Sequence, residues 1–293
     1  MPERTHPQTI HALNEALRAE HTAILQYLQH TYALGGTFAD ELEEIAREEM
    51  WHLKALGEAV ADLGGEPAVW ARGDIQVDAP SPATLLRLDL AAEERMIVRC
   101  RRGTASAEDH AARRLFERLL QDEEAHRHEV EEMTEALERR PRLTLVIPRT
   151  STRTIQLLAE DVQAEYRVLL KYLYQSFKLR HSHSEISRTL ELQAIESMKH
   201  LGWFSEAIVA LGGRILPRPE SPVPMEGSLL ALLKGDLGDE QAALAQYRRH
   251  LGEVSEPEAR APLLRISGQE VFHEEEFVEL IARVARQEGT GKE

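Results

Sequence analysis

Hydrophobic residues recur every three or four positions through most of the chain, which is the spacing of amphipathic helices. In the first half, four such segments follow one another, and no convincing alternating strand pattern appears. The pattern therefore predicts four helices. Their apolar stripes are Ile10, Leu13, Leu17, Ile24 and Tyr27; Leu42, Ile45, Leu56 and Leu63; Leu86, Met96, Ile97 and Cys100; and Leu119, Val130 and Met133.

The second half of the chain repeats this pattern. Thr9-Ile10 recurs as Thr154-Ile155, and Leu63-Gly64-Gly65 recurs as Leu211-Gly212-Gly213. The offset drifts only between 145 and 148 residues, so each copy has the length of a domain rather than of a solenoid unit. The repeated stripes are Leu158, Val162, Leu169 and Tyr172, then Leu190, Phe204, Ile208 and Leu211.

Long proline-containing connections separate the second and third helices of each copy. They span 64–83 and 212–227, long enough to run the length of a helical bundle. Each copy is therefore predicted to be a four-helix bundle with one long crossover. We expect domains at 1–140 and 153–293, joined by a linker at 141–152 that includes an extended stretch, Leu143–Ile147.

Composition narrows the classes of partner. A net charge of -15 over 293 residues argues against nucleic acid, because binding phosphates needs a basic surface. No apolar run reaches the roughly 20 residues of a membrane span, and the start, MPERTHPQTI, lacks the apolar core of a signal peptide. We therefore expect a cytoplasmic protein without a membrane partner. The single cysteine, Cys100, excludes an internal disulfide and a cysteine-based zinc or iron–sulfur centre.

Polar residues interrupt the apolar stripes of the first copy at inward positions. Each helix places one carboxylate there, and the second and fourth helices add a histidine one turn later. Burying an unpaired carboxylate costs several kcal/mol, and no basic residue shares these stripes. Two divalent cations would balance four carboxylates, with iron or manganese the best match and zinc an alternative. The predicted ligands are Glu20, Glu49, His52, Glu93, Glu123 and His126.

Four segments carry a resemblance to a known family. LNEALRAEHTAILQYLQH (13–30), REEMWH (47–52), LRLDLAAE (86–93) and LLQDEEAH (119–126) resemble the four helices of bacterioferritin. The similarity covers nearly all of the first copy, and the second copy in the same order. It implies an all-α fold of two tandem ferritin-like four-helix bundles.

The resemblance also implies a role for each residue at the first site. Glu49 and Glu123 would bridge two iron ions, and Tyr27 would form a hydrogen bond to a ligand, although an ordinary core tyrosine is an equal alternative. The terminal ligands would be Glu20, Glu93, His52 and His126.

The second copy departs from the pattern at one position. Ser197 stands where the bridging Glu49 stands in the first copy, and the adjacent Glu196 points about 100° away on a helix. We therefore expect an impaired second site that is mononuclear or empty. Its predicted ligands are Glu165, His200, Glu240, Glu270 and His273.

A methionine follows each of these aligned positions. In bacterioferritin-like proteins a methionine at this place can hold haem across a two-fold interface, so Met50 and Met198 could together bind one haem. The alternative, which we favour, is that both methionines pack between the two bundles.

Three functions fit this site. The leading hypothesis is ferroxidase-type oxidation of Fe(II) by O₂ or H₂O₂, in iron handling or oxidative-stress defence. The second is a di-metal oxidase or oxygenase acting on a small organic substrate, or a manganese catalase-like enzyme. The third is a non-enzymatic metal-binding or scaffold protein. The chain ends at Glu293 without an evident fifth helix, so we expect a monomer or small homo-oligomer rather than a cage.

Overall fold

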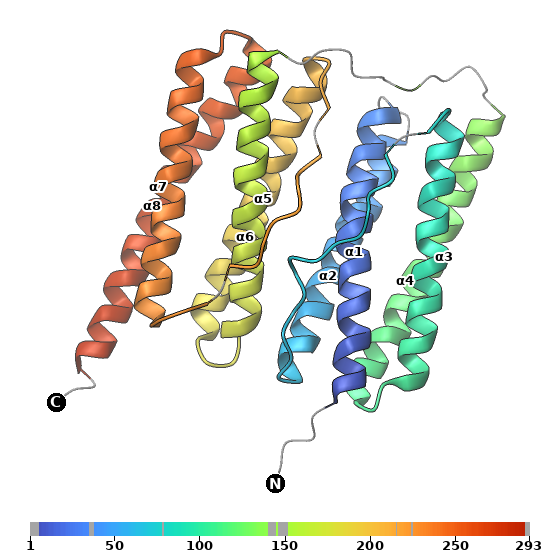
Figure 1. The fold of residues 1–293 in the computed structure, drawn as a ribbon, viewed down its shortest axis with the longest axis horizontal. Coiled ribbons are helices and arrows are strands. Elements are labelled where there is room, and N and C mark those ends of the chain that lie inside the picture. Colours follow the sequence, from blue (N-terminus) through green and yellow to red (C-terminus); the bar gives the residue numbers. More distant parts are fainter. Residues whose placement is uncertain are drawn as a thin grey trace. The chain divides into compact units, whose positions relative to one another are not determined.

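The computed structural model describes residues 6–34, 38–77, 79–139, 145, 152–214, 216–223 and 225–290, without the side chains of 288–290. All regular secondary structure in this part of the chain is helical, as predicted. The chain separates into two compact units, Met1–Ile147 and Pro148–Glu293. The helices, shown in Figure 1, are α1 (Pro7–Leu34), α2 (Ala39–Asp62), α3 (Pro82–Ser106), α4 (His110–Glu138), α5 (Arg153–Leu179), α6 (Ser184–Ala210), α7 (Leu229–Glu253) and α8 (Pro257–Thr290).

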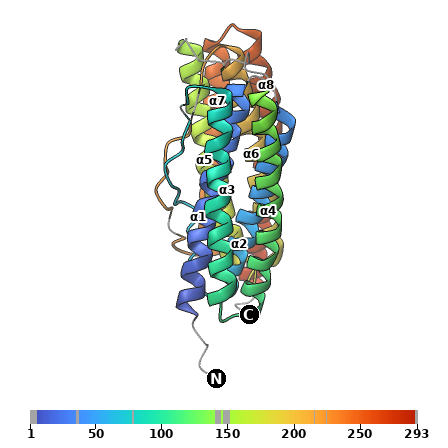
Figure 2. The same cartoon turned by 90° about the vertical axis from the view of Figure 1, so that its right-hand side faces the viewer.

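In the first unit α1 packs against α2 and α3, and α4 packs against α3 and α2 (Figure 2). The buried faces coincide with the predicted apolar stripes, so that Leu13, Leu17, Leu56 and Leu119 are fully buried. The closed bundle removes this apolar surface from water, which is the main stabilising term of such a fold.

The connection between α2 and α3 runs along α1 for the length of the bundle (Figure 1). Side chains of α1 hold it at points about two turns apart: the Asn14 amide donates to Glu66 O at 2.9 Å, and Thr22 Oγ1 accepts from Gly73 N at 2.8 Å. These bonds satisfy backbone groups of the crossover that no secondary structure pairs. The third helix begins at Pro82, so the last two residues of the predicted connection belong to α3.

The repeated Leu-Gly-Gly sequence ends the second helix of each unit for a steric reason. Gly64 and Gly212 adopt φ of 72° and 77°, the left-handed conformation that favours glycine. A Cβ on Gly65 would lie 2.8 Å from the Ile10 side chain, and one on Gly213 would lie 3.0 Å from Ile155. Both glycines are therefore needed for the crossover to leave the helix against its neighbour.

The second unit repeats the arrangement. α5 packs against α6 and α7, and α8 packs against α7 and α6. Its crossover is held by Gln163, which accepts from Arg218 N at 2.8 Å and donates to Arg218 O at 3.2 Å. No helix in the described part of the chain is long and apolar enough to cross a membrane.

The predicted linker, 141–152, lies outside the described residues except for Leu145 and Thr152, and so does most of the extended stretch Leu143–Ile147. Leu145 packs against the core of the first unit. Thr152 caps α5, because its hydroxyl accepts from Ile155 N.

Candidate metal centre

The four helices of the first unit bring all six predicted ligands together in the core. Each of the six residues is at most 2% exposed. The ligand atoms form two overlapping groups within which all atoms lie within 4.8 Å of one another. Both groups contain Glu49 and Glu123, so two cations placed there would share these carboxylates. The first group adds Glu20 and His52, and the second adds Glu93 and His126.

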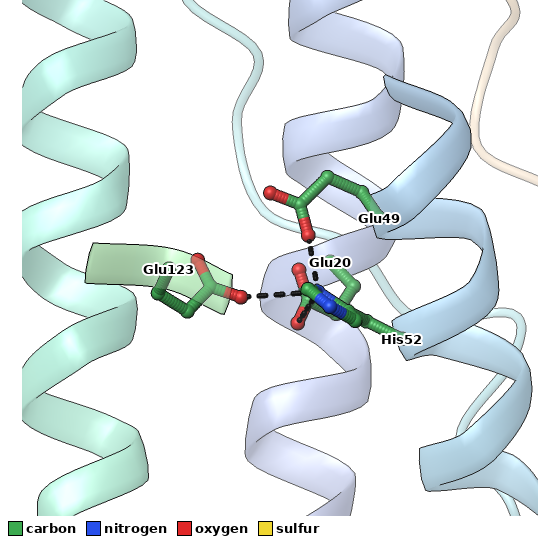
Figure 3. A group of neighbouring side chains, drawn as sticks. All are labelled: Glu20, Glu49, His52 and Glu123. Atoms are coloured by element: carbon green, nitrogen blue, oxygen red, sulfur yellow. Dashed lines mark hydrogen bonds and ion pairs between the residues drawn. The ribbon is translucent and has the colours of Figure 1, made fainter. Parts of the chain in front are cut away.

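The Nδ1 atom of His52 lies at the centre of the first group. It is 2.7 Å from Glu49 Oε2, 3.1 Å from Glu123 Oε1 and 3.6 Å from Glu20 Oε1. Figure 3 shows the carboxylates of Glu49 and Glu123 directed toward this ring, Glu49 from above and Glu123 from the left, with Glu20 close by. The imidazole therefore presents a nitrogen to the same space as three carboxylates.

In the second group, the Nδ1 atom of His126 lies 3.3 Å from Glu49 Oε1 and 3.9 Å from Glu93 Oε2. Tyr27 is fully buried and donates a hydrogen bond to the other oxygen of Glu93. The Tyr27 hydroxyl thus orients a carboxylate whose remaining oxygen faces the cluster.

Two acidic residues outside the predicted set contact the outer side of the histidines. Asp122 on α4 lies 3.3 Å from Nε2 of His52, and Glu48 on α2 lies 2.9 Å from Nε2 of His126. Thus α4 supplies a carboxylate to the histidine of α2, and α2 supplies one to the histidine of α4. Such partners hold a metal-binding imidazole in one tautomer and orientation. Each directly precedes a predicted ligand in the sequence, as Glu48-Glu49 and Asp122-Glu123. Such a pair of adjacent acidic residues is the sequence pattern that could have indicated them.

A second buried network lies one turn from Glu93 on α3. Asp89 accepts from Gln26 Nε2 at 2.8 Å and lies 2.7 Å from His30 Nδ1. The other ring nitrogen of His30 is 2.7 Å from Gln76 O in the crossover. The network ties α1, α3 and the crossover together beside the site. Asp89 is not among the residues that the sequence analysis assigned to the site.

The first site contains buried acceptor atoms with no hydrogen-bond partner in the protein. Five carboxylate oxygens and one imidazole nitrogen are in this state. Buried polar atoms are nearly always paired, so a cluster of six that faces one space requires a positively charged occupant. These atoms are Glu20 Oε1, Glu49 Oε1, Glu93 Oε2, both Glu123 oxygens and His126 Nδ1.

The carboxylates hold shifted pKa values because of their burial and crowding. Burial and the neighbouring carboxylates, Glu49 in particular, raise the pKa of Glu20, Glu93 and Glu123 above the ordinary range. Burial acts in the same sense on Glu49, but its contacts with His126 and His52 outweigh it and lower the pKa to about 2. In the metal-free protein, bound protons must therefore neutralise part of the negative charge of the four carboxylates.

The histidines respond in the opposite way. Burial alone would lower the pKa of His126, yet contact with Glu49 raises it to about 9. The pKa of His52 is raised further by Glu123, Glu20 and Glu49, which also outweigh burial. Two imidazolium ions would still leave two of the four carboxylates unbalanced, whereas two divalent cations would balance all four with neutral imidazoles. The donor set therefore fits two metal ions.

The metal-free first unit is expected to become less stable as the pH rises from 6.5 to about 9. The folded state holds the His126 proton more tightly than the unfolded chain, so this contribution is present below pH 6.5 and is lost as the pH rises through about 9. The raised pKa values of Glu20, Glu93 and Glu123 act in the same direction.

Metal ions should remove this trend, because they bind neutral imidazole and ionised carboxylate. Urea denaturation of metal-free and metal-loaded protein at pH 6.5, 8 and 9 measures the effect. A metal-free protein whose stability rises across this interval would contradict the assignment.

The second unit brings its five predicted ligands together in two smaller groups. They are Glu165, His200 and Glu270, and Glu240, Glu270 and His273. Glu270 alone belongs to both groups. His200 Nδ1 lies 3.1 Å from Glu165 Oε1 and 3.0 Å from Glu270 Oε1, and His273 Nδ1 lies 3.1 Å from Glu270 Oε2.

Ser197 is buried at the position that Glu49 occupies in the first unit. Tyr247 takes the place of Cys100 and donates to Glu165 Oε1 at 2.5 Å, while Tyr172 donates to Glu240. No oxygen of the three carboxylates is both buried and unpaired in the described structure. Contact with Glu165 and Glu270 raises the pKa of His200 to about 10 despite its burial. This cluster therefore compensates much of its own charge.

The outer carboxylate contacts of the first site have no counterpart in the second. Gln269 stands in the position of Asp122, and His200 Nε2 has no hydrogen-bond partner in the described structure. Glu196 stands in the position of Glu48, but it lies 2.6 Å from Lys199. The second site therefore differs from the first in its outer contacts as well as at Ser197.

A family model described as the ferritin-like domain matches residues 10–140 and again residues 155–286. The two matches cover most of the chain. This chain belongs to the ferritin-like family. Two copies of the ferritin-like domain in one chain confirm the tandem repeat and the predicted fold class. The buried groups of glutamate and histidine lie where the four helices of each ferritin-like bundle meet.

The ferritin-like chain has distant bacterioferritin relatives. It is 30% identical over 126 residues to a bacterioferritin from Desulfovibrio desulfuricans, covering 41% of this chain and 70% of that protein. It is 32% identical over 127 residues to one from Rhodobacter capsulatus, covering 41% and 78%. A solved structure of the latter bacterioferritin, described with a metal-free dinuclear site and a haem iron, matches 45% of this chain and 87% of that one, with 30% identity and a TM-score of 0.42.

The two methionines considered for haem are half-buried in their separate units. Met50 lies on α2 and Met198 on α6, each next to an aligned site position. This exposure is compatible with packing and with a ligand role, so haem binding by the ferritin-like chain stays a prediction.

Proposed function

We propose that the first unit is a di-iron centre that oxidises Fe(II) with O₂ or H₂O₂, in iron handling or oxidative-stress defence. The observation that supports this most is the convergence of Glu20, Glu49, Glu93 and Glu123 with unpaired, buried oxygens. Carboxylate oxygen and imidazole nitrogen suit iron or manganese, and zinc less so for redox work. Two bound ferrous ions would supply the electrons for reducing the oxidant.

The chain itself contributes position and charge balance. Glu49 and Glu123 belong to both ligand groups and are proposed to bridge the ions, while Glu20 and Glu93 are proposed as terminal ligands. Tyr27 keeps one oxygen of Glu93 engaged, so the other oxygen would be available to hold a metal ion. The surrounding apolar bundle excludes bulk water, which strengthens these electrostatic interactions.

Stopped-flow absorbance tests the proposal directly. Anaerobically Fe(II)-loaded protein, mixed with O₂ or with H₂O₂, should develop the absorption of oxo-bridged ferric ion much faster than Fe(II) in buffer. Metal analysis of protein purified from its own host identifies the resident ion. Absence of any ferric signal with either oxidant would reject the ferroxidase assignment and favour a non-enzymatic metal-binding or scaffold role.

Substituting Ser197→Glu is expected to raise the metal content by one ion per chain. The change restores the bridging carboxylate that the second unit lacks, beside His200 and Glu270. Metal analysis after anaerobic loading measures it, with Ser184→Glu, an exposed change on the same helix, as the control. An unchanged metal content in the folded Ser197 variant would contradict the alignment of the two sites.

A second candidate function is oxidation of a small organic substrate at the same metals. It is favoured by a cavity of about 190 Å³ whose lining includes Glu20, Glu49, Glu93 and Glu123. Oxidation of Fe(II) alone does not need a space of this size. Turnover of an organic compound with consumption of O₂ would distinguish this function from the first.

Haem binding and assembly are separate proposals. A Soret band in haem-replete protein, lost in Met50→Leu and Met198→Leu variants, would support a methionine-ligated haem, whereas absence of the band would assign both residues to packing. The proposed assembly is a monomer or small homo-oligomer. Light scattering coupled to size-exclusion chromatography measures it.

A further inference from the structure

The cavity beside the first metal site lies among α1, α3 and the part of the crossover around Gly73 and Gln76. Its volume is about 190 Å³. An apolar cavity of about 150 Å³ is known to hold benzene, so this space suits a ligand of roughly one aromatic ring with a substituent. The inner lining of the cavity is formed by the carboxylates of the first site, so a ligand in the cavity would lie next to metal ions bound there.

The lining of the cavity has three chemical parts. Small and apolar side chains form the first part. The buried carboxylates of the cluster form the second, inner part. More exposed charged residues of α1, α3 and the crossover form the third. The apolar side chains are Ala19, Ala23, Ala92 and Met96, and the charged residues beyond the cluster are Arg18, Arg95, Arg99, Glu15 and Asp74.

The arginines are positioned to receive an anion. Arg95 and Arg99 lie one turn apart on the same face of α3, and neither forms an ion pair with a carboxylate in the described structure. Arg18 lies 3.4 Å from Glu15, and both side chains remain partly exposed. A guanidinium group binds a carboxylate through two parallel hydrogen bonds. Three arginines against two acids also make this entrance net positive in a chain of net charge -15.

The second unit lacks this feature at the equivalent positions. Gln163, Ala242 and Gln246 replace the three arginines at the offsets of the repeat. Gln163 is engaged with the crossover, and Gln246 donates to Asp161 at 2.8 Å. The arginine set therefore accompanies the unit with the complete ligand set.

We propose that this cavity binds a small organic carboxylate, held by Arg18, Arg95 and Arg99 at the entrance, with its apolar part against Ala23 and Met96 beside the metals. The inference rests on the proposed di-metal site and gives its second candidate function a substrate class. Two metal ions are required, because four unneutralised carboxylates at the inner end would repel an anion.

Isothermal titration of the full-length, Mn(II)-loaded protein with benzoate tests the proposal. Benzamide, its neutral analogue, and inorganic phosphate serve as comparison ligands. The test variant is Arg95→Gln/Arg99→Gln. The control is Arg87→Gln/Arg101→Gln, which removes the same charge from α3 at residues that pair with Glu138 and Glu124 and do not line the cavity.

We expect one benzoate per chain, equal affinity in the wild type and the control, and affinity at least about tenfold lower in the test variant. Benzamide should bind at least about tenfold more weakly than benzoate. Equal benzoate affinity in both double variants would overturn the proposal, because it would mean direct coordination to the metal without the arginines. So would two benzoates per chain, or binding of phosphate in preference to benzoate.

Metal content, measured on the same samples before titration, separates the two levels of the argument. A chain that takes up no metal overturns both the di-metal site and the carboxylate site. A fully loaded chain that does not bind benzoate overturns the carboxylate site alone.

Discussion

Replacing Glu49 by glutamine is expected to lower the rate of Fe(II) oxidation by at least about a hundredfold. Loss of an outer partner of a metal ligand typically costs ten- to a hundredfold, and Glu49 belongs to both ligand groups themselves. Its oxygens lie 2.7 Å from Nδ1 of His52 and 3.3 Å from Nδ1 of His126. The neutral amide has the same size but removes the charge that both ions share. Stopped-flow absorbance measures the rate of Fe(II) oxidation, and metal analysis measures how many ions the variant retains.

The matched control is Glu44→Gln, an exposed position on the same helix. It removes one negative charge from α2 without touching the cluster, so its rate and metal content should equal those of the wild type. Circular dichroism establishes that both variants keep the helical fold. A Glu49 variant that retains two ions and the wild-type rate would show that the oxidation occurs elsewhere.

Each bound metal ion is expected to stabilise the first unit by about 4 kcal/mol when free Mn(II) is a thousandfold above the dissociation constant of its site. This follows from linkage, because the converging site exists only in the folded state. For a unit of this size the midpoint of thermal unfolding should rise on the order of 10 °C. Removal of the metal by a chelator should reverse the rise.

The tryptophans allow the first unit to be followed alone. Trp51 and Trp70 lie in the first unit and Trp203 in the second, so a Trp203→Phe background reports on the first unit by fluorescence. Phenylalanine keeps an aromatic ring at the position where Arg265 stacks, 3.5 Å from the ring centroid. In this background, Glu49→Gln should abolish most of the rise in the midpoint of thermal unfolding that metal loading causes. A shift of equal size with and without Glu49 would place the stabilising ion outside this cluster.

The helices and the ligand set could be predicted from the sequence because both depend on local periodicity. Residues three or four apart share a helix face, so Glu20 between Leu17 and Ile24 had to point the same way as its apolar neighbours. Because several such carboxylates faced one core, their negative charge then required a cation to balance it. The turn at Gly64-Gly65 was equally readable, because glycine favours the left-handed conformation of Gly64 and leaves room for the close approach at Gly65.

The remaining features depend on pairs of residues far apart in the chain. The contacts of Asp122 with His52 and of Glu48 with His126 join different helices, and no periodicity in one helix specifies them. Likewise, Arg18 and Arg95 line one cavity only because the crossover places α1 beside α3. The distances between residues on different helices are set by how the helices pack against one another.

The amino-acid order thus determined two bundles, a crossover in each, and six inward-facing glutamate and histidine side chains in the first, since helix periodicity and turn sterics act within a few residues. The tertiary structure alone decided which carboxylate oxygens stay unpaired, how the second cluster compensates its own charge through Tyr247 and His200, and where a cavity opens beside the first cluster. These depend on distances between helices, which side-chain packing across the whole bundle sets.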